Sequence, residues 1–209
     1  MAIIRYSFFV NRNSNITMRV LFLCALMLLL YSCKKDNQAL PELPDPVGFT
    51  KYIIKKGQHY TTENNFVQVD TAALDFTVQF DRSAEYTTTD PYNQYDINKL
   101  YGFSDNGAAH HQYSARFGWR WSDGALRLFA YVYNNSQVVS EEIGIVPIGT
   151  PIRCRIAVAD NQYHFYCNEW IKTIPRASTT PKGKGYLLYP YFGGDETAPH
   201  DITIWIKNT

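Results

Sequence analysis

Two arginines and several aromatic residues alternate with other residue types in one short stretch of the sequence. They are Arg116, Arg120, Phe129, Tyr131 and Tyr133. Residues two apart in a β-strand share one face of the sheet. A guanidinium group matches the fork geometry of a carboxylate, and binding sites for small molecules combine aromatic walls with a few polar groups. The pattern therefore indicates a sheet face that holds a polar, ring-shaped or acidic ligand, and we favour non-catalytic carbohydrate binding.

A β-hairpin positions these side chains. Asp123-Gly124 is favoured in a type I′ turn, because both central residues of that turn need positive φ. With these residues in the turn, Ser122 opposes Ala125 and every further pair is determined. One face is then wholly apolar and is expected to contact a core. The apolar face consists of Phe117, Trp119, Trp121, Leu126, Leu128, Ala130 and Val132, and the opposite face of Ser114, Arg116, Gly118, Arg120, Arg127, Phe129, Tyr131 and Tyr133.

The rest of the chain from Phe49 onward also alternates with a period of two, which is typical of strands. Turn-forming residues separate the short runs, and no stretch shows a helical period over three turns. We predict an all-β fold, an antiparallel β-sandwich of the jelly-roll type, in one domain at 49–209. The other expected strands cover residues 49–54, 74–80, 96–103, 152–167, 170–174, 186–192 and 201–206, with a short strand or connector at 144–147.

Cys154 and Cys167 lie in a second predicted hairpin. With Asp160-Asn161 as its two-residue loop, the two cysteines oppose each other at a non-hydrogen-bonded position, where Cα atoms approach to about 4.5 Å. That separation permits a bridge. We therefore expect a cross-strand disulfide, with two free buried cysteines as the alternative.

The beginning of the chain has the features of a bacterial secretion signal. Met18-Arg19 precedes the apolar run 20–30, which is shorter than the roughly 20 residues needed to span a bilayer. Leu30-Tyr-Ser-Cys33 resembles the lipobox of bacterial lipoproteins. We expect residues 1–32 to be a signal peptide whose true start is Met18, and Cys33 to carry the lipid anchor.

Residues 33–48 contain three prolines and are expected to form an extended tether behind the lipid. Removal of 1–32 takes away three arginines and no acidic residue, which leaves 17 basic and 19 acidic residues. Without a basic stripe, nucleic acid is not an expected partner. The expected location is the bacterial cell envelope, on an outer-membrane lipoprotein that faces the periplasm or the exterior and contacts the membrane through its anchor.

Two motifs resemble a known family. Asn98-Lys-Leu-Tyr-Gly-Phe103, followed by Ser114-Ala-Arg-Phe-Gly-Trp-Arg120, is similar to the motifs of jelly-roll polysaccharide lyases of the alginate and glucuronan lyase type. Those enzymes belong to the concanavalin A-like sandwich group. The whole chain also resembles small secreted lipoproteins of unassigned activity. The resemblance implies a concanavalin A-like jelly roll and, as an alternative function, lyase activity by β-elimination on a uronic-acid polymer.

Such a lyase needs a group that neutralises the carboxylate, a base for the C5 proton and an acid for the leaving oxygen. Arg116, Arg120 and Gln112 are candidates for carboxylate binding, and His110 or His111 for the base. Candidates for the acid are Tyr131, Tyr189 and Tyr191. A third possibility is a structural or protein-interaction role without a glycan, because arginine–tyrosine pairs also stabilise exposed sheet faces.

Other chemistries are less well supported. A calcium ion would suit the oxygen ligands of Asp195, Glu196 and Asp201, but we favour the interpretation that they are solvated acids in a glycine-rich turn. The histidines lack the spacing of zinc motifs, and the adjacent Glu141 and Glu142 do not form the carboxylate pair of a glycosidase. We therefore expect no metal and no cofactor.

Overall fold

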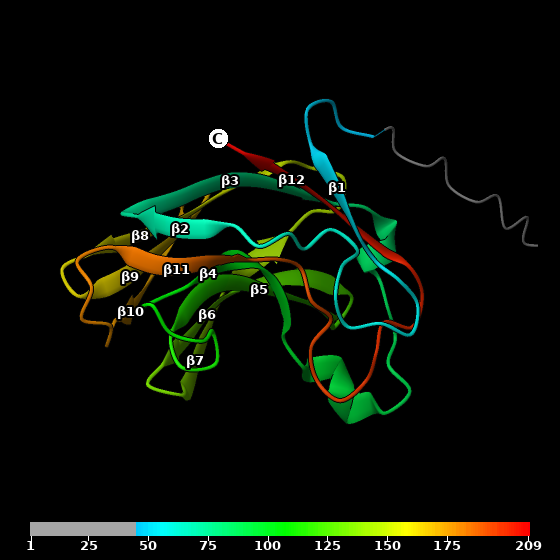
Figure 1. Ribbon diagram of the computed structural model, residues 1–209. Coiled ribbons are helices and arrows are strands. Elements are labelled where there is room, and N and C mark those ends of the chain that lie inside the picture. Colours follow the sequence, from blue (N-terminus) through cyan, green and yellow to red (C-terminus); the bar gives the residue numbers. More distant parts are fainter. Residues whose placement is uncertain (1–44) are drawn as a thin grey trace, which may run out of the picture. The chain divides into compact units, whose positions relative to one another are not determined.

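The computed structural model describes residues 45–209, which form two six-stranded antiparallel sheets packed as a sandwich (Figure 1). The first sheet has the order β1–β12–β3–β8–β9–β10 and the second β2–β11–β4–β5–β6–β7. The strands of the first sheet are β1 (Thr50–Ile54), β12 (Ile202–Asn208), β3 (Ala73–Phe80), β8 (Ile152–Ala159), β9 (Gln162–Cys167) and β10 (Trp170–Pro175). Those of the second are β2 (Gln68–Thr71), β11 (Gly183–Leu188), β4 (Asn98–Ser104), β5 (Ser114–Ser122), β6 (Ala125–Asn134) and β7 (Gln137–Val146).

Two short 3-10 helices, η1 (Arg82–Ala84) and η2 (Pro91–Tyr95), connect β3 to β4. The predicted all-β jelly-roll sandwich is confirmed. The connector expected at 144–147 is instead the end of the long strand β7, whose first five residues are all exposed. Exposure on both faces removes the apolar alternation that would mark a strand in the sequence.

The central hairpin has the predicted register. Asp123 (φ 54°) and Gly124 (φ 69°) form the turn, Ser122 pairs with Ala125, and the ladder continues to Ser114 and Tyr133. Successive residues of β5 therefore face opposite sides of the second sheet.

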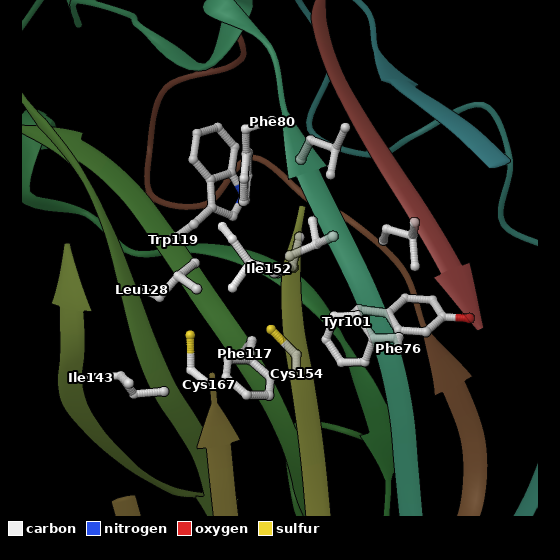
Figure 2. Close-up of a cluster of buried hydrophobic side chains, with 14 of the residues drawn as sticks. Phe76, Phe80, Tyr101, Phe117, Trp119, Leu128, Ile143, Ile152, Cys154 and Cys167 are labelled. Carbon is white, nitrogen blue, oxygen red and sulfur yellow. The ribbon is translucent and has the colours of Figure 1, made fainter. Parts of the chain in front are cut away.

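Aromatic rings from both sheets fill the space between them (Figure 2). The ring of Phe117 on β5 meets that of Phe76 on β3 at 5.6 Å and that of Phe165 on β9 at 5.3 Å, both nearly edge-on. Trp119 contacts Phe80 at 5.5 Å. Edge-to-face pairs contribute about 0.5–1.5 kcal/mol beyond the burial of their area. The apolar face of β5 thus holds the second sheet against the first.

Cys154 and Cys167 oppose each other across β8 and β9, as predicted. Both are free and buried, so the predicted disulfide is absent from this structure. Figure 2 shows the two side chains among the core residues. Burial, followed by the neighbouring Cys167, raises the pKa of Cys154 well above its usual value. The two cysteines pack as small apolar side chains. Their position opposite each other on neighbouring strands does not by itself mean that they form a disulfide.

The predicted signal peptide, Cys33 and most of the tether lie outside the described residues. Within residues 45–209, no helix is long and apolar enough to cross a membrane.

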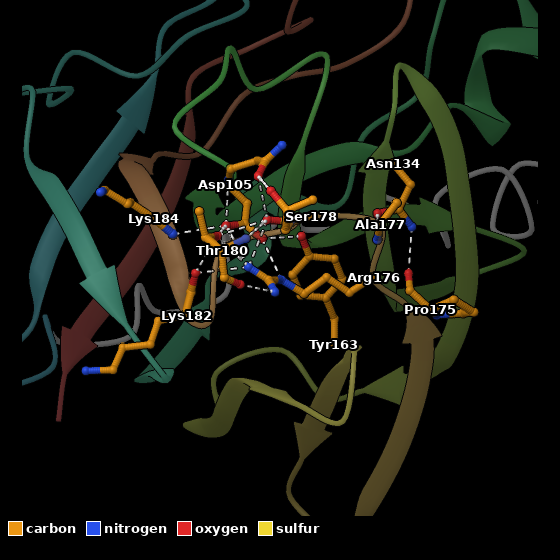
Figure 3. A network of polar contacts seen from close by, with 12 residues as sticks. Asp105, Asn134, Tyr163, Pro175, Arg176, Ala177, Ser178, Thr180, Lys182 and Lys184 are labelled. Atoms are coloured by element: carbon orange, nitrogen blue, oxygen red, sulfur yellow. Dashed lines mark hydrogen bonds and ion pairs between the residues drawn. The ribbon is translucent and has the colours of Figure 1, made fainter.

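A buried ion pair joins the two sheets (Figure 3). Asp105 follows β4 in the second sheet, and Arg176 follows β10 in the first. Arg176 Nε donates to Asp105 Oδ2 at 2.7 Å, and a terminal guanidinium nitrogen donates to Oδ1 at 3.1 Å. The hydroxyl of Tyr163 and the backbone N–H of Lys184 also donate to this carboxylate. Strands that are distant in sequence are therefore held through one carboxylate.

The pKa of Asp105 reflects two opposing effects. Burial by itself would raise it, but the hydrogen bonds from Arg176, Tyr163 and two backbone N–H groups outweigh burial and hold the pKa below its usual value. The stability that this carboxylate contributes is therefore present above the ordinary aspartate pKa and is lost as the pH falls through the lower, folded-state pKa.

Replacing Arg176 with Met should leave the Asp105 charge buried without a cation. We expect the free energy of unfolding to fall by about 3–5 kcal/mol, measured by urea denaturation at pH 7. The matched control is Arg155→Met, which breaks a pair with Asp75 whose side chains are 48% and 37% exposed and should cost at most about 1 kcal/mol. Equal losses in the two variants would contradict the role given to the buried pair.

Candidate functional site

A group of cationic and tyrosine side chains gathers on the outer face of the second sheet, opposite the core. We call it the Arg116 cluster, and it comprises Lys99 from β4, Arg116 from β5, Tyr131 and Tyr133 from β6, Tyr186 from β11, and the loop residues His110 and Tyr191. Strand alternation places Arg116 here, because its neighbour Phe117 faces the core.

Arg116 is the centre of this group. It is 6% exposed, and its buried Nε has no hydrogen-bond partner. No carboxylate within residues 45–209 forms an ion pair with it. Burial lowers the pKa of Arg116 to about 10, although the nearby tyrosine hydroxyls act in the opposite direction. At neutral pH this side chain is therefore a desolvated cation with an unused donor.

Lys99 is the second cation of the cluster. Its Nζ lies 4.8 Å from the centre of the Tyr131 ring and donates to the carbonyl of Ile97 at 2.6 Å. Burial, followed by repulsion from Arg116, lowers the pKa of Lys99 to about 8. The charge of Asp96 acts on Lys99 in the opposite direction, but within residues 45–209 no carboxylate forms an ion pair with either cation. Two such neighbouring positive charges favour the binding of an anion.

His110 and Tyr186 form one side of the cluster. The Tyr186 hydroxyl accepts a hydrogen bond from the His110 backbone N–H at 3.1 Å and lies 2.8 Å from His110 Nδ1. Burial, together with the charge of Arg116 and the nearby His111, lowers the pKa of His110 to about 4. Its ring is therefore neutral at pH 7. The His111 ring lies 4.2 Å from that of His110 and 5.5 Å from that of Tyr133.

Tyr131 contacts both cations. Its ring centre lies 4.8 Å from Lys99 Nζ and 5.8 Å from the Arg116 guanidinium carbon, within the range of cation–π attraction. Burial and the neighbouring Tyr133 raise the pKa of Tyr131 to about 12, so its hydroxyl stays protonated. Tyr131 is only 8% exposed, and its ring positions the cations rather than offering an open stacking surface.

Glycines make room for the cluster. A Cβ on Gly102 would come within 2.4 Å of the Arg116 Cα and Cβ, and one on Gly193 within 2.6 Å of Lys99 Nζ. A Cβ on Gly118 would meet the Ile97 side chain at 2.5 Å. Any larger residue at these positions would displace the groups that surround the two cations.

Arg120 and Phe129 lie on the same face but form a separate contact. The Arg120 guanidinium carbon lies 4.8 Å from the Phe129 ring centre and 5.4 Å from that of Tyr95. Arg120 also donates to the Tyr95 carbonyl at 2.8 Å and to Ser122 Oγ at 3.1 Å. These contacts attach η2 to the sheet. They occupy two N–H donors of the Arg120 guanidinium, which was predicted to bind a carboxylate.

Of the remaining residues predicted for the site, Gln112 and Tyr189 lie outside the Arg116 cluster. Gln112 is exposed in the turn before β5, and its backbone carbonyl accepts a hydrogen bond from the Ser136 backbone N–H at 3.0 Å. The Tyr189 ring packs against core tyrosines, 5.9 Å from Tyr52 and 6.0 Å from Tyr101. Tyr189 is therefore not brought to the cluster.

Tyr191, two residues further on, belongs to the cluster. It is 37% exposed, and its ring stacks on that of His59 at 5.3 Å. Strand β11 ends at Leu188 before Pro190, so strict alternation does not continue from Tyr189. Two backbone hydrogen bonds then join Tyr191 to Lys99.

Three residues of this region were not predicted from the sequence, namely Lys99, Tyr186 and His59. Lys99 stands in a strand motif that the sequence analysis noted, and a cation alternating with core residues is a usable signal for an outward-facing site. No local signal marks Tyr186 or His59, because strand pairing and loop placement bring them here.

Two of the three acidic residues considered for calcium, Glu196 and Asp201, bond to the protein itself. Glu196 accepts from the backbone N–H groups of Thr89 and Asp90 and from the Asn93 amide, and these bonds lower its pKa to about 2. Asp201 accepts from Lys55. Within residues 45–209, no cluster of three or more potential metal ligands occurs.

No family model matches this sequence, and no curated protein matches it. Solved structures do match. The alginate lyase AlyC3 aligns with a TM-score of 0.54 at 10% identity, over 77% of this chain and 74% of that one. An alginate lyase from Klebsiella pneumoniae aligns with a TM-score of 0.49 at 14% identity, over 66% and 59% of the two chains. A glycoside hydrolase family 16 endo-glucanase from Bacteroides ovatus gives 0.48 at 10%, over 83% and 86%.

At these identities the likeness concerns the fold. The described domain is a jelly-roll β-sandwich of the concanavalin A-like type, with a distant resemblance to jelly-roll lyases.

Replacing Lys99 with Met should stabilise the protein, because it removes a desolvated charge beside Arg116. At pH 7 we expect a gain on the order of 1 kcal/mol, or about 2–4 °C in Tm. The pKa of Lys99 is about 8 when folded, against 10.5 ordinarily. Between these two pH values the unfolded chain therefore binds more protons than the folded chain. The free energy of unfolding of the wild-type protein rises with pH across that window and approaches that of the variant.

The measurement is thermal unfolding of both proteins between pH 7 and 10. Lys172→Met, at an exposed ion pair with Glu141, is the control and should show no such convergence. A destabilised Lys99→Met protein at pH 7 would contradict the charge argument.

Proposed function

We propose that this protein binds carbohydrate on the outer face of its second sheet, with the carboxylate of an acidic sugar between Arg116 and Lys99. The observation that carries the proposal is the buried Arg116 guanidinium, whose Nε has no partner. An unpaired buried donor and a desolvated charge both cost free energy. A carboxylate would satisfy both, because a guanidinium binds it through parallel hydrogen bonds.

The surroundings of Arg116 support a sugar rather than a simple inorganic ion. Tyrosine hydroxyls and a neutral histidine lie around the cations and offer hydrogen bonds to the hydroxyl groups of a sugar ring. Tyr191 adds a partly exposed ring at the edge of the cluster. The fold supports the same proposal, since one protein of similar fold is named an alginate lyase.

We also propose that the protein is a lipoprotein of the bacterial cell envelope, attached to the outer membrane through Cys33. The lipobox-like residues 30–33 and the proline-containing tether support this. Mass spectrometry of the mature N-terminus tests it: an acylated Cys33 is expected, and mature protein with an unmodified Cys33 would contradict the anchor.

Arg116→Ala should weaken binding of uronic-acid oligosaccharides by about 10- to 100-fold. A hydrogen bond to a charged group contributes about 1.5–3 kcal/mol, and about 1.4 kcal/mol corresponds to a tenfold change in Kd. Isothermal titration of the full chain with uronic and neutral oligosaccharides gives the affinities. A melting curve of the variant checks that the domain still folds.

The matched control is Arg153→Ala, at an exposed arginine on the first sheet, and it should leave affinity unchanged. Unaltered uronic-acid binding by the Arg116→Ala protein would exclude this cluster as the site. Binding of neutral glycans alone would keep carbohydrate binding but contradict the carboxylate between the two cations.

One observation favours a second candidate, a polysaccharide lyase. Neutral His110 and protonated Tyr131 stand beside the cation that would neutralise a uronic carboxylate. A neutral imidazole can accept the C5 proton, and a tyrosine hydroxyl can protonate the leaving oxygen. The arrangement thus contains the three roles that β-elimination requires.

The lyase candidate predicts a rise in ultraviolet absorbance when the protein meets a uronic-acid polymer, because β-elimination creates a conjugated double bond. His110→Gln should reduce this rate by about 100-fold or more, while His164→Gln on the first sheet should not change it. Ligand binding without any rise in absorbance would exclude this candidate and leave binding alone.

A further inference from the structure

We propose that a second sugar residue of the same ligand binds in a pocket that shares Tyr186 with the Arg116 cluster. This inference rests on the proposed carbohydrate-binding function and extends it to a chain of several sugar residues. The pocket has a volume of about 510 Å³, which lies in the usual range for small-molecule sites. Its lining consists of Phe66, Gln68, Lys184, Gly185 and Tyr186, together with residues 107–109.

Phe66 supplies an aromatic surface. Its side chain is 79% exposed, although it is a large apolar ring in a chain with a well-filled core. Its ring lies 5.7 Å from that of Tyr186 at an interplanar angle of 32°. The adjoining Val67 carbonyl accepts from the Leu187 backbone N–H at 2.9 Å, which ties this end of the loop to β11. The ring is thus held in position while one surface stays open to a ligand.

Lys184 supplies a charge. Its backbone N–H donates to the buried Asp105 carboxylate at 3.0 Å, whereas Figure 3 shows its side chain pointing away from that network. Its ammonium forms no ion pair within residues 45–209. A cation, the amide of Gln68 and an aromatic ring in one pocket match the carboxylate, hydroxyl groups and apolar ring face of a uronic acid.

Tyr186 connects this pocket to the Arg116 cluster. Its hydroxyl lies 2.8 Å from His110 Nδ1, and its ring contacts Phe66 and lines the pocket. A ligand that crosses Tyr186 therefore reaches both places. Two sites that share one side chain suit successive residues of one polymer, and their binding is linked through the ligand.

The test is isothermal titration of the full chain with a uronic monosaccharide and a uronic hexasaccharide. Wild-type protein should bind the longer ligand more tightly. Phe66→Ala should weaken hexasaccharide binding by about three- to tenfold and leave monosaccharide binding unchanged. Lys184→Gln should act in the same way on the uronic hexasaccharide and not on a neutral one. The control is Tyr92→Ala, at an 87% exposed ring on η2, which should alter neither.

The outcomes separate this inference from the proposed function. Hexasaccharide affinity that is unchanged in the Phe66→Ala and Lys184→Gln proteins, with wild-type binding that Arg116→Ala weakens, would overturn the second site and leave the first. Equal weakening of both ligand lengths by Phe66→Ala would also overturn it. No binding of either length by wild-type protein would overturn both proposals.

Discussion

Neighbouring residues of a β-strand face opposite sides of a sheet, and this constraint on β5 connects the core of the protein with its proposed site. Phe117 and Trp119 are fully buried between the sheets, while Arg116, the residue directly before Phe117, lies on the outer face. The energy of aromatic packing keeps the strand in register. The position of the guanidinium is therefore as well defined as the core, and no flexible loop is needed to present it.

Local chemistry made part of this arrangement predictable. The Asp123-Gly124 turn determines the register of the hairpin and hence which face carries Arg116. The rest depends on long-range or irregular features. The register shift in β4 after Lys99 and the break at Pro190 alter which residues join the cluster. The buried ion pair joins residues 71 positions apart in the chain, and no periodicity marks such a pair.

The charges of the protein are arranged in two different ways. Asp105 and Arg176 are buried together and satisfy each other, so their desolvation is offset by mutual attraction and hydrogen bonds. Arg116 and Lys99 are desolvated side by side, no carboxylate within residues 45–209 forms an ion pair with either, and burial lowers the pKa of each. Such a local conflict is expected at a functional site rather than in a region that serves stability alone.

The strand order has a consequence for synthesis and folding. In the first sheet, β12 lies between β1 and β3, so the last strand to be made fills a gap between two of the first. Until it is present, β1 and β3 each have an unpaired edge, and such edges pair readily with other chains. The sheet cannot close before β12 has been made, and long-range pairing of this kind folds slowly. Loss of the final strand would therefore divide the sheet rather than shorten it.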